Sequence, residues 1–322
     1  MNRIKTQWLV ILISVVAMTP LLSVEVRAEK RIGVLLWSEE HRYIEAKNGI
    51  MEQLRKDGFG EPAVKFIIEN AGGNKATLSE IVQVFAAAKM DMIISIGTTA
   101  AIAVTREIKD VPVVFSMVYD PVEVNIAQQW KNSGNNTTGA SPKVPMSKLM
   151  AVLKMFAPVK RLAVLYTPAE KNSVVQLKEL LSVQSDFQVE VVPVPLTNSE
   201  EVALILPEVI RTVDAIYLSG SSIVGKTTSV IVDLATKAKV VTITHLDDLA
   251  KEGVLLGVCA NPYAVGRLAA RKAVKVLKGA KPSSIPIETL KNLDLIINRK
   301  TVKAGQFKIP PSFMKSATKV IE

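Results

Sequence analysis

Residues 92–115, MIISIGTTAAIAVTREIKDVPVVF, contain the pattern that decides the fold. Residues 92–96 form a short apolar run rich in isoleucine, which predicts a buried strand. Gly97 follows it, and residues 98–108 then place apolar side chains at helical spacing. A second apolar run, residues 113–115, predicts another strand. Strand, helix and strand in this order predict a βαβ unit with two parallel strands and a helix across one face of the sheet.

The same alternation extends to both sides of this unit. Before it we expect strands at 31–37 and 64–68 and helices at 42–57 and 78–88. After it we expect strands at 161–166, 189–194, 215–219, 240–243 and 254–258, and helices at 146–156, 173–181, 199–211, 224–238 and 263–277. Repeated βαβ units with apolar strands predict parallel sheets covered by helices on both faces.

A polar stretch, residues 131–145 (KNSGNNTTGASPKVP), divides the chain into two similar blocks. Its Gly, Pro, Asn and Ser residues are typical of a linker or hinge. There are too many βαβ units for one compact sheet. We therefore expect an α/β protein with two doubly wound lobes, one mostly within 29–140 and one mostly within 141–254.

Composition excludes several classes of protein. The chain has 322 residues, of which 48% are hydrophobic and 22% charged, so disorder over most of its length is excluded. One cysteine, Cys259, excludes an internal disulfide framework, and two histidines with one thiol cannot form a zinc finger or a three-histidine zinc site. The net charge is +10, and the basic residues within 298–319 lie among few aromatics. We expect a solvated face there, with no nucleic-acid binding, and we predict no cofactor.

The first 28 residues have the layout of a secretory signal peptide. Arg3 and Lys5 precede the apolar run WLVILISVV at 8–16, and Val26 and Ala28 stand at −3 and −1 of a predicted cut. An uncleaved anchor is the alternative, but polar residues and Pro20 interrupt the apolar stretch. No cysteine lies near the cut, which excludes a lipoprotein anchor. The sequence thus predicts a cleaved, exported protein of the periplasm.

In open parallel sheets, ligands bind beyond the carboxyl ends of the strands. The candidate ligand-binding residues are therefore those that follow the predicted strands: Trp37, Ser38, Thr98, Thr99, Tyr119, Asp120, Asn172, Ser173, Ser221, Ser222, His245 and Asp247.

Each candidate also has a structural alternative. Thr98 and Thr99 open a helix whose free amides attract an anion such as a carboxylate, but Thr98 is also a candidate helix cap. The same two readings apply to Asn172 with Ser173. Asp120 is suited to a ligand ammonium or to starting a turn, and Asp247 to an ammonium or a solvated helix start. Trp37 is suited to stacking on a ligand or to packing in the core, and a structural role is the more common one for His245.

Residues 220–227, GSSIVGKT, match the P-loop pattern of nucleotide-binding proteins, after a predicted strand and before a predicted helix. Predicted export, the late position of the motif and the lack of a strand ending in a magnesium-binding Asp all count against nucleotide binding. We expect instead a loop in which Ser221 and Ser222 face a ligand.

An ordered set of short segments resembles a known family. It comprises RIGVL at 31–35, IGTTAA at 96–101, DPV at 120–122, KRLAVLYTPAEKNS at 160–173, DAIY at 214–217 and VGR at 265–267. Together they resemble the ABC-transporter substrate-binding proteins, in particular relatives of the tryptophan- and tyrosine-binding members, over residues 31–310.

The resemblance implies a type I periplasmic binding protein fold with two Rossmann-like lobes joined by three crossings at a hinge. It implies an N-terminal lobe of 29–140 plus 259–283 and a C-terminal lobe of 141–258 plus 284–322. It also implies a monomer without catalytic activity that closes around a small, amino-acid-like ligand and delivers it to an ABC permease. A ligand carboxylate would bind at Thr98 with Thr99 and at Asn172 with Ser173.

Two departures concern the ligand's ammonium group. Family members often carry an acidic residue or Asn in the loop that is Ser219–Ser222 here, and Ser-Asp or Ser-Glu where this chain has Thr244-His245. Asp120 or Asp247 would then have to replace the lost acid, or the ligand is no α-amino acid. Three other functions stay open: a sensory module that docks on a membrane receptor, an exported enzyme, and a nucleotide-binding protein.

Overall fold

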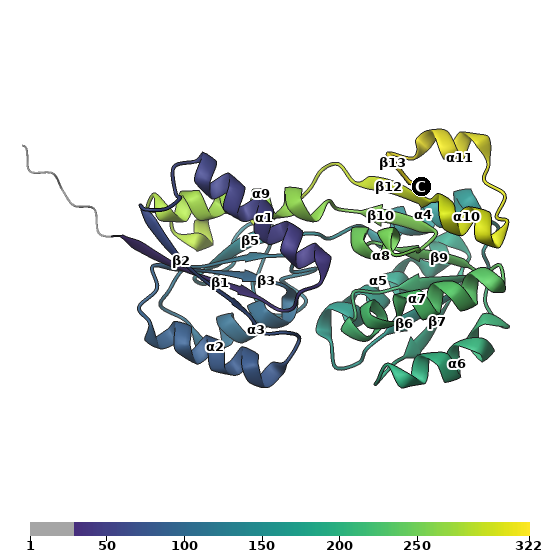
Figure 1. Cartoon of the computed structure of the whole chain (residues 1–322), viewed down its shortest axis with the longest axis horizontal. Coiled ribbons are helices and arrows are strands. Elements are labelled where there is room, and N and C mark those ends of the chain that lie inside the picture. The colour runs from purple at the N-terminus through teal and green to yellow at the C-terminus, as the bar shows by residue number, and fades with distance from the viewer. Residues whose placement is uncertain (1–28) are drawn as a thin grey trace, which may run out of the picture.

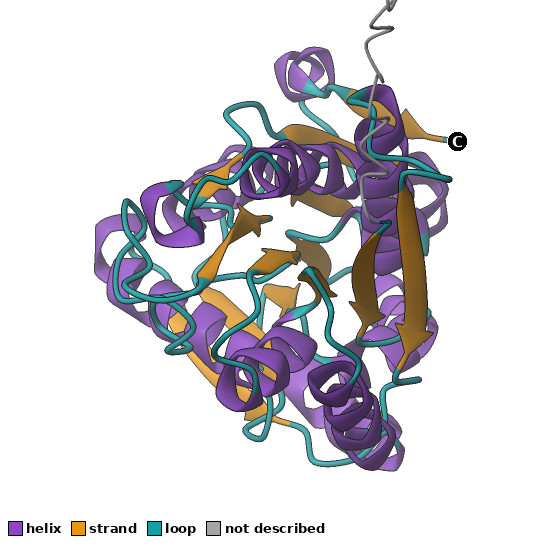
Figure 2. Ribbon diagram, turned by 90° about the vertical axis from the view of Figure 1, so that its left-hand side faces the viewer, coloured by secondary structure: helices purple, strands orange, loops and turns teal. Residues whose placement is uncertain are grey.

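The computed structural model describes residues 29–322 and shows two α/β lobes side by side (Figure 1). The signal peptide expected at 1–28 lies outside the described residues. Each lobe is built on one mostly parallel sheet with helices on both faces, as Figure 2 shows from the end of the first lobe. This confirms the predicted pair of doubly wound lobes.

The first lobe has a six-stranded sheet in the order β11-β5-β4-β3-β1-β2. All its strand pairs are parallel. The strands are β1 (Lys30–Leu36), β2 (Val64–Asn70), β3 (Met92–Ile96), β4 (Val113–Ser116), β5 (Thr137–Ser141) and β11 (Glu288–Thr289). The helices are α1 (His41–Lys56), α2 (Lys75–Ala87), α3 (Thr98–Glu107), α9 (Pro262–Leu277) and the short 3-10 helix η1 (Pro282–Ser284).

The second lobe has a seven-stranded sheet in the order β13-β12-β10-β9-β8-β6-β7, in which only β10 and β12 pair antiparallel. The strands are β6 (Arg161–Tyr166), β7 (Glu190–Pro195), β8 (Ala215–Leu218), β9 (Val241–Thr244), β10 (Leu256–Cys259), β12 (Asp294–Asn298) and β13 (Lys319–Ile321). The helices are α4 (Met146–Phe156), α5 (Lys171–Phe187), α6 (Glu200–Ile210), α7 (Ser222–Lys237), α8 (Asp247–Lys251), α10 (Arg299–Gly305) and α11 (Pro311–Ser316).

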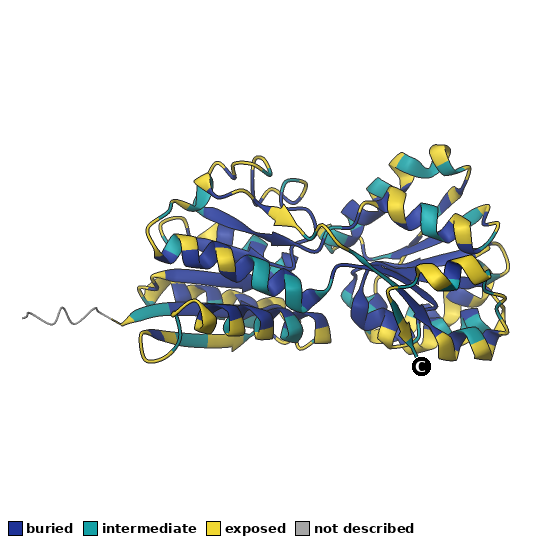
Figure 3. Ribbon diagram, turned by 90° about the horizontal axis from the view of Figure 1, so that it is seen from above, coloured by how far each residue is buried: buried dark blue, intermediate teal, exposed yellow. Residues whose placement is uncertain are grey.

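The apolar runs of the sequence form the interior strands. Every residue of β3, β4, β8 and β9 is buried, while exposed residues gather on the outer helix faces (Figure 3). In the first lobe, α1 and α9 cross in close contact through two glycines. A Cβ on Gly49 would lie 2.1 Å from the Tyr263 carbonyl oxygen, and one on Gly266 would lie 2.0 Å from that of Ala46. Only glycine permits this approach of the two backbones.

The stretch 131–145, expected as a linker, contains a strand. Residues Thr137–Ser141 form β5, all of them buried between β4 and β11. Their small side chains fit because Gly139 leaves room for Phe115; a Cβ there would lie 2.3 Å from the Phe115 carbonyl oxygen. The first crossing between the lobes is therefore shorter than predicted and lies between Ser141 and Met146.

The last crossing also differs from the expectation that residues 284–322 belong to the second lobe. Ile285 and Ile287 are buried, Thr138 donates a hydrogen bond to the Ile285 carbonyl, and β11 pairs with β5 in the first sheet. The chain thus returns to the second lobe only between β11 and β12. Within residues 29–322, no helix combines the length and the apolar character that a membrane span requires.

Candidate ligand-binding site

Three adjacent cavities lie where the carboxyl ends of the two sheets face each other. One has a volume of about 690 Å³ and is lined by Trp37, α2 and α3 of the first lobe and by residues 167–171 of the second. Another has about 430 Å³ and is lined by residues 38–42 and by α7 and α8. Between the lobes a third space, about 20 Å³, is nearly filled by large side chains. Both lobes line each cavity, as expected for a ligand site in this architecture.

Eight of the twelve predicted residues line these cavities. Trp37 and Thr99 line the 690 Å³ cavity, Ser38 lines the 430 Å³ cavity, and Ser222 lines both. Thr98 lies between the large cavity and the central space. The remaining three line the central space: Tyr119, Asn172 and His245.

The α3 N-terminus opens into the 690 Å³ cavity without a cap. Gly97 precedes the helix at φ 102°, no side chain caps it, and Ala101 is the first residue whose amide bonds back to Gly97. The amides of Thr98, Thr99 and Ala100 therefore donate no hydrogen bond to another described residue. Thr98 does not cap its own helix; its hydroxyl accepts a hydrogen bond of 3.4 Å from the Tyr119 amide. Uncapped amides and the helix dipole together favour an anionic group at this point.

The α7 N-terminus, in contrast, is already satisfied by protein groups. Ser221 caps it, accepting hydrogen bonds from the amides of Ile223 and Val224. The Glu170 carboxylate accepts two more from the Ser222 amide, at 3.1 and 3.0 Å. Because the Ser221 side chain is directed to its own helix, the expectation that it faces a ligand together with Ser222 is not met.

The segment 220–227, which matches the P-loop pattern in sequence, lies mostly in the first turns of α7. A P-loop needs an open loop whose amides surround the phosphates. Here α7 already begins at Ser222, and the Gly225 amide donates to the Ser221 carbonyl at 2.9 Å. Most of the matched residues are thus helical, and a carboxylate stands where a phosphate would bind. The matched residues therefore do not form the open phosphate-binding loop of a P-loop.

Three further predicted residues are engaged within the protein. Asp120 starts a turn, accepting from the amides of Val122 and Glu123, and its other oxygen pairs with Lys143 at 2.5 Å. Asp247 is buried between Lys251 at 2.5 Å and Lys319 at 3.2 Å. Ser173 accepts from the Thr167 amide at 3.1 Å and lies in the core. None of these three lines any of the cavities between the lobes.

His245 lies in a buried hydrogen-bonded ring with Tyr217 and Gln176. Its Nδ1 is 2.7 Å from the Tyr217 hydroxyl and its Nε2 is 3.3 Å from the Gln176 amide nitrogen. Tyr217 in turn donates to the Gln176 carbonyl oxygen at 3.4 Å. All three contacts are satisfied when the imidazole is neutral and carries its proton on Nδ1. Burial, reinforced by the Arg42 charge, lowers the His245 pKa to about 3, so the ring is neutral at physiological pH.

Asn172 and Gln176, one turn apart on α5, hold the loop after β8. Asn172 donates to the Gly220 carbonyl at 2.5 Å, and Gln176 accepts from the Gly220 amide at 2.8 Å. Both residues line the central space. Asn172 therefore shapes the cleft and lines it at the same time.

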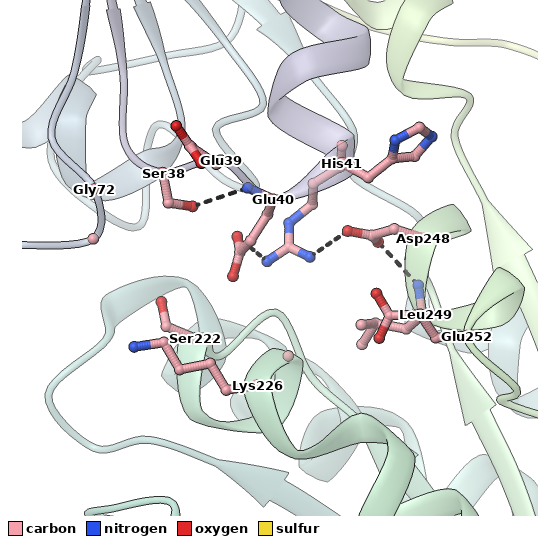
Figure 4. Close-up of a pocket in the computed structure, with 13 residues that line it drawn as sticks. Ser38, Glu39, Glu40, His41, Gly72, Ser222, Lys226, Asp248, Leu249 and Glu252 are labelled. Atoms are coloured by element: carbon pink, nitrogen blue, oxygen red, sulfur yellow. Dashed lines mark hydrogen bonds and ion pairs between the residues drawn. The ribbon is translucent and has the colours of Figure 1, made fainter.

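Several contacts join the two lobes across the cleft. The Trp37 indole donates to the Ser222 hydroxyl at 3.4 Å, and Tyr119 donates to Glu179 at 2.7 Å. Lys143, in the first crossing, contacts both Asp120 of the first lobe and Glu179 of the second. Arg42 on α1 pairs with Asp248 on α8 at 2.7 Å (Figure 4).

Among the cleft residues that the prediction from sequence missed are Glu40, Arg42, Glu170, Gln176 and Asp248. Glu40, Glu170 and Asp248 lie near or beside the predicted residues Ser38, Asn172 and Asp247 in the segments that follow strands. Arg42 lies in the first turn of α1 and Gln176 in the second turn of α5, where distance from the strand gives no signal. In the described chain, no group of His, Cys, Asp and Glu side chains is arranged to hold a metal ion.

Comparison with known proteins agrees with this geometry. The sequence profile described as ABC transporter substrate binding protein matches residues 31–321. A tyrosine-binding protein of Clostridioides difficile is 27% identical over 281 residues, which cover 86% of this chain and 81% of that protein.

Two solved structures have the same fold. One is an ABC domain in complex with L-Trp from Streptococcus pneumoniae, 25% identical, with a TM-score of 0.86 over 91% of this chain and 100% of that one. The other is the ligand-free, open structure of a substrate binding protein with adhesive properties from Clostridium difficile. It is 28% identical, with a TM-score of 0.73 over 91% of this chain and 99% of that one. The fold is that of the type I periplasmic binding proteins, and the chain belongs to the ABC transporter substrate-binding protein family.

Proposed function

We propose that this protein is the periplasmic binding component of an ABC importer, and that it holds a small carboxylate-bearing, amino-acid-like ligand between its lobes. Membership of the family supports the binding role. The amino acids named for two relatives, tyrosine and tryptophan, support the ligand class. Delivery to a permease in the inner membrane follows from this role.

The observation that carries the proposal is the uncapped N-terminus of α3 at the edge of a cavity shared by both lobes. A ligand carboxylate fits the three free amides there, with the Thr98 and Thr99 hydroxyls as further donors. The Trp37 indole and the apolar side chains of Leu78, Val82 and Ile102 line the same cavity and suit an apolar or aromatic part of the ligand.

An acidic residue of the same cavity suits the ligand's ammonium group. Asp120 and Asp247, the two expected candidates, are paired with lysines and lie away from the cavity. Glu170 lines it, opposite Thr98 and Thr99, and forms no ion pair within the described chain. Burial raises the pKa of the Glu170 carboxyl, and a ligand cation beside it would favour its charged form.

The proposed mechanism is closure of the lobes around the ligand. Contacts from Trp37 and Tyr119 to the second lobe exist only when the lobes are close. The chain resembles the tryptophan complex more than the ligand-free, open relative, with TM-scores of 0.86 and 0.73. A ligand that touches both lobes stabilises the closed arrangement by its differential affinity for it.

Calorimetric titration of residues 29–322 with L-tyrosine, L-tryptophan and a panel of other amino acids and aromatic carboxylates tests the proposal. We expect binding of at least one of them, weakened at least tenfold in the Thr98→Ala, Thr99→Ala double variant, because both hydroxyls line the cavity. The exposed Thr212→Ala serves as the matched control and should bind like the wild type. No binding across the panel would overturn the ligand class, and unchanged affinity in the double variant would overturn the site.

A further inference from the structure

We infer that Arg42 and Asp248 form an ionic latch between the lobes, which stabilises the closed arrangement and thereby sets ligand affinity without either residue contacting the ligand. The inference deepens the proposed function and rests on it, because a latch matters for affinity only if ligand binding requires closure.

The latch joins elements of different lobes. Arg42 lies in the first turn of α1 and Asp248 in α8, which packs on the second sheet. One guanidinium nitrogen donates to Asp248 Oδ2 at 2.7 Å and the other to Glu40 Oε2 at 2.5 Å. Glu40 and Asp248, both labelled in Figure 4, therefore accept hydrogen bonds from different nitrogens of the same guanidinium. The Arg42 and Asp248 side chains are only 3% and 4% exposed.

The second lobe also contacts Glu40, the third member of this group. A Cβ on Gly225 of α7 would lie 3.3 Å from Glu40 Oε1, and Lys226 lines the same cavity. Glu40 therefore lies against the second lobe while it pairs with Arg42 of its own lobe. Opening the lobes would separate Arg42 from Asp248 and return both charges to water.

The latch is distinct from the ligand cavity. Neither Arg42 nor Asp248 lines the 690 Å³ cavity that contains Trp37, Thr98 and Glu170. Both outer nitrogens of the guanidinium are already engaged by protein carboxylates. Beside it the central space is about 20 Å³, too small for an amino acid. Arg42 is thus a positioning residue that acts through the arrangement of the lobes.

Removing one partner of a buried ion pair leaves the other charge buried and unpaired, which is costly. In Arg42→Ala the Asp248 carboxylate is buried without its cation only in the closed arrangement, because opening the lobes exposes it to water. The substitution therefore destabilises the closed arrangement relative to the open one. The closed-to-open ratio should therefore fall at least about tenfold. In Asp248→Ala the closed-to-open ratio should fall less, because Arg42 still pairs with Glu40. In the double variant the two effects should be non-additive, as coupled residues require.

Distances between spin labels on the two lobes test the latch without any ligand. Labels on cysteines introduced at Glu80 of α2 and Glu208 of α6, both exposed, would report the separation of the lobes. Cys259 is buried and should not take up the label. We expect a shift to longer distances in Arg42→Ala and a shorter distribution again in Arg42→Met, Asp248→Leu, where a packed apolar pair replaces the charges.

The control is Lys237→Ala, which removes an exposed ion pair with Asp233 inside one lobe and should leave the distances unchanged. Circular dichroism of each variant confirms that it is folded. Identical distance distributions in wild type and Arg42→Ala would overturn the latch. Failure of the wild type to bind any ligand would instead overturn the proposed function, and the two failures are separated because the distances need no ligand.

Discussion

His245 makes the stability of the second lobe depend on pH in a calculable way. Its pKa is lowered to about 3 by burial, against 6.5 in the unfolded chain. Between these values the unfolded chain binds a proton that the folded ring does not, so stability is lost as pH falls below 6.5. Each pH unit costs about 1.4 kcal/mol, which amounts to about 2 kcal/mol at pH 5. At pH 7.5 and above the ring is neutral in both the folded and the unfolded chain, so His245 causes no loss of stability.

Comparison with His245→Gln isolates this effect. Glutamine retains hydrogen-bonding groups toward Tyr217 and Gln176 but does not titrate. The raised pKa values of Glu40 and Glu170 act in the opposite direction, and both proteins share them. Urea unfolding at pH 7.5, 6.5, 5.5 and 5.0, followed in the second lobe, should show the wild type losing about 2 kcal/mol more than the variant. A difference that stays constant over this range would refute the neutral, buried imidazole. With only two histidines in the chain, the His245 ring can also be followed directly by NMR.

Three further predictions concern packing, the thiol and the P-loop match. Gly266→Ala should destabilise the first lobe by about 1–3 kcal/mol and lower its melting temperature, because the alanine Cβ would overlap the Ala46 carbonyl. An unchanged melting curve would contradict this contact between α1 and α9. Burial raises the pKa of the Cys259 thiol, so a thiol reagent should react only after denaturant is added, and rapid reaction of the native protein would contradict this. Lys226→Ala should bind ATP no differently from the wild type, with no heat of binding in either, whereas ATP binding that is lost in the variant would restore the P-loop reading.

The fold followed from the sequence where each element had its own pattern. Apolar strands and amphipathic helices alternate clearly. The predicted boundaries of the strand, helix and strand within residues 92–115 agree with those of β3, α3 and β4 to within one residue. β5 was missed because its small residues Thr137–Ser141 resemble a loop in composition and become a strand only through burial between β4 and β11. β11 was assigned to the wrong lobe because its two residues carry no signal of which sheet they join.

The site was less predictable, because the sequence shows where a side chain leaves a strand but not where it points. Trp37, Thr98 and Thr99 line a cavity. Asp120 and Asp247 also follow strands, but their carboxylates form ion pairs with lysines instead. Arg42 and Asp248 are 206 positions apart, and only the meeting of two lobes brings them together. Such pairs depend on tertiary structure alone.

The role of the α3 N-terminus is tested most directly by comparing a ligand with its uncharged analogue. Wild-type residues 29–322 would be titrated calorimetrically with the best-binding amino acid of the panel and with its carboxamide. The free amides of Thr98, Thr99 and Ala100 predict that the carboxylate binds at least about tenfold more tightly, since charge-assisted hydrogen bonds are lost in the amide. Equal affinity for the two would contradict a carboxylate site at this helix.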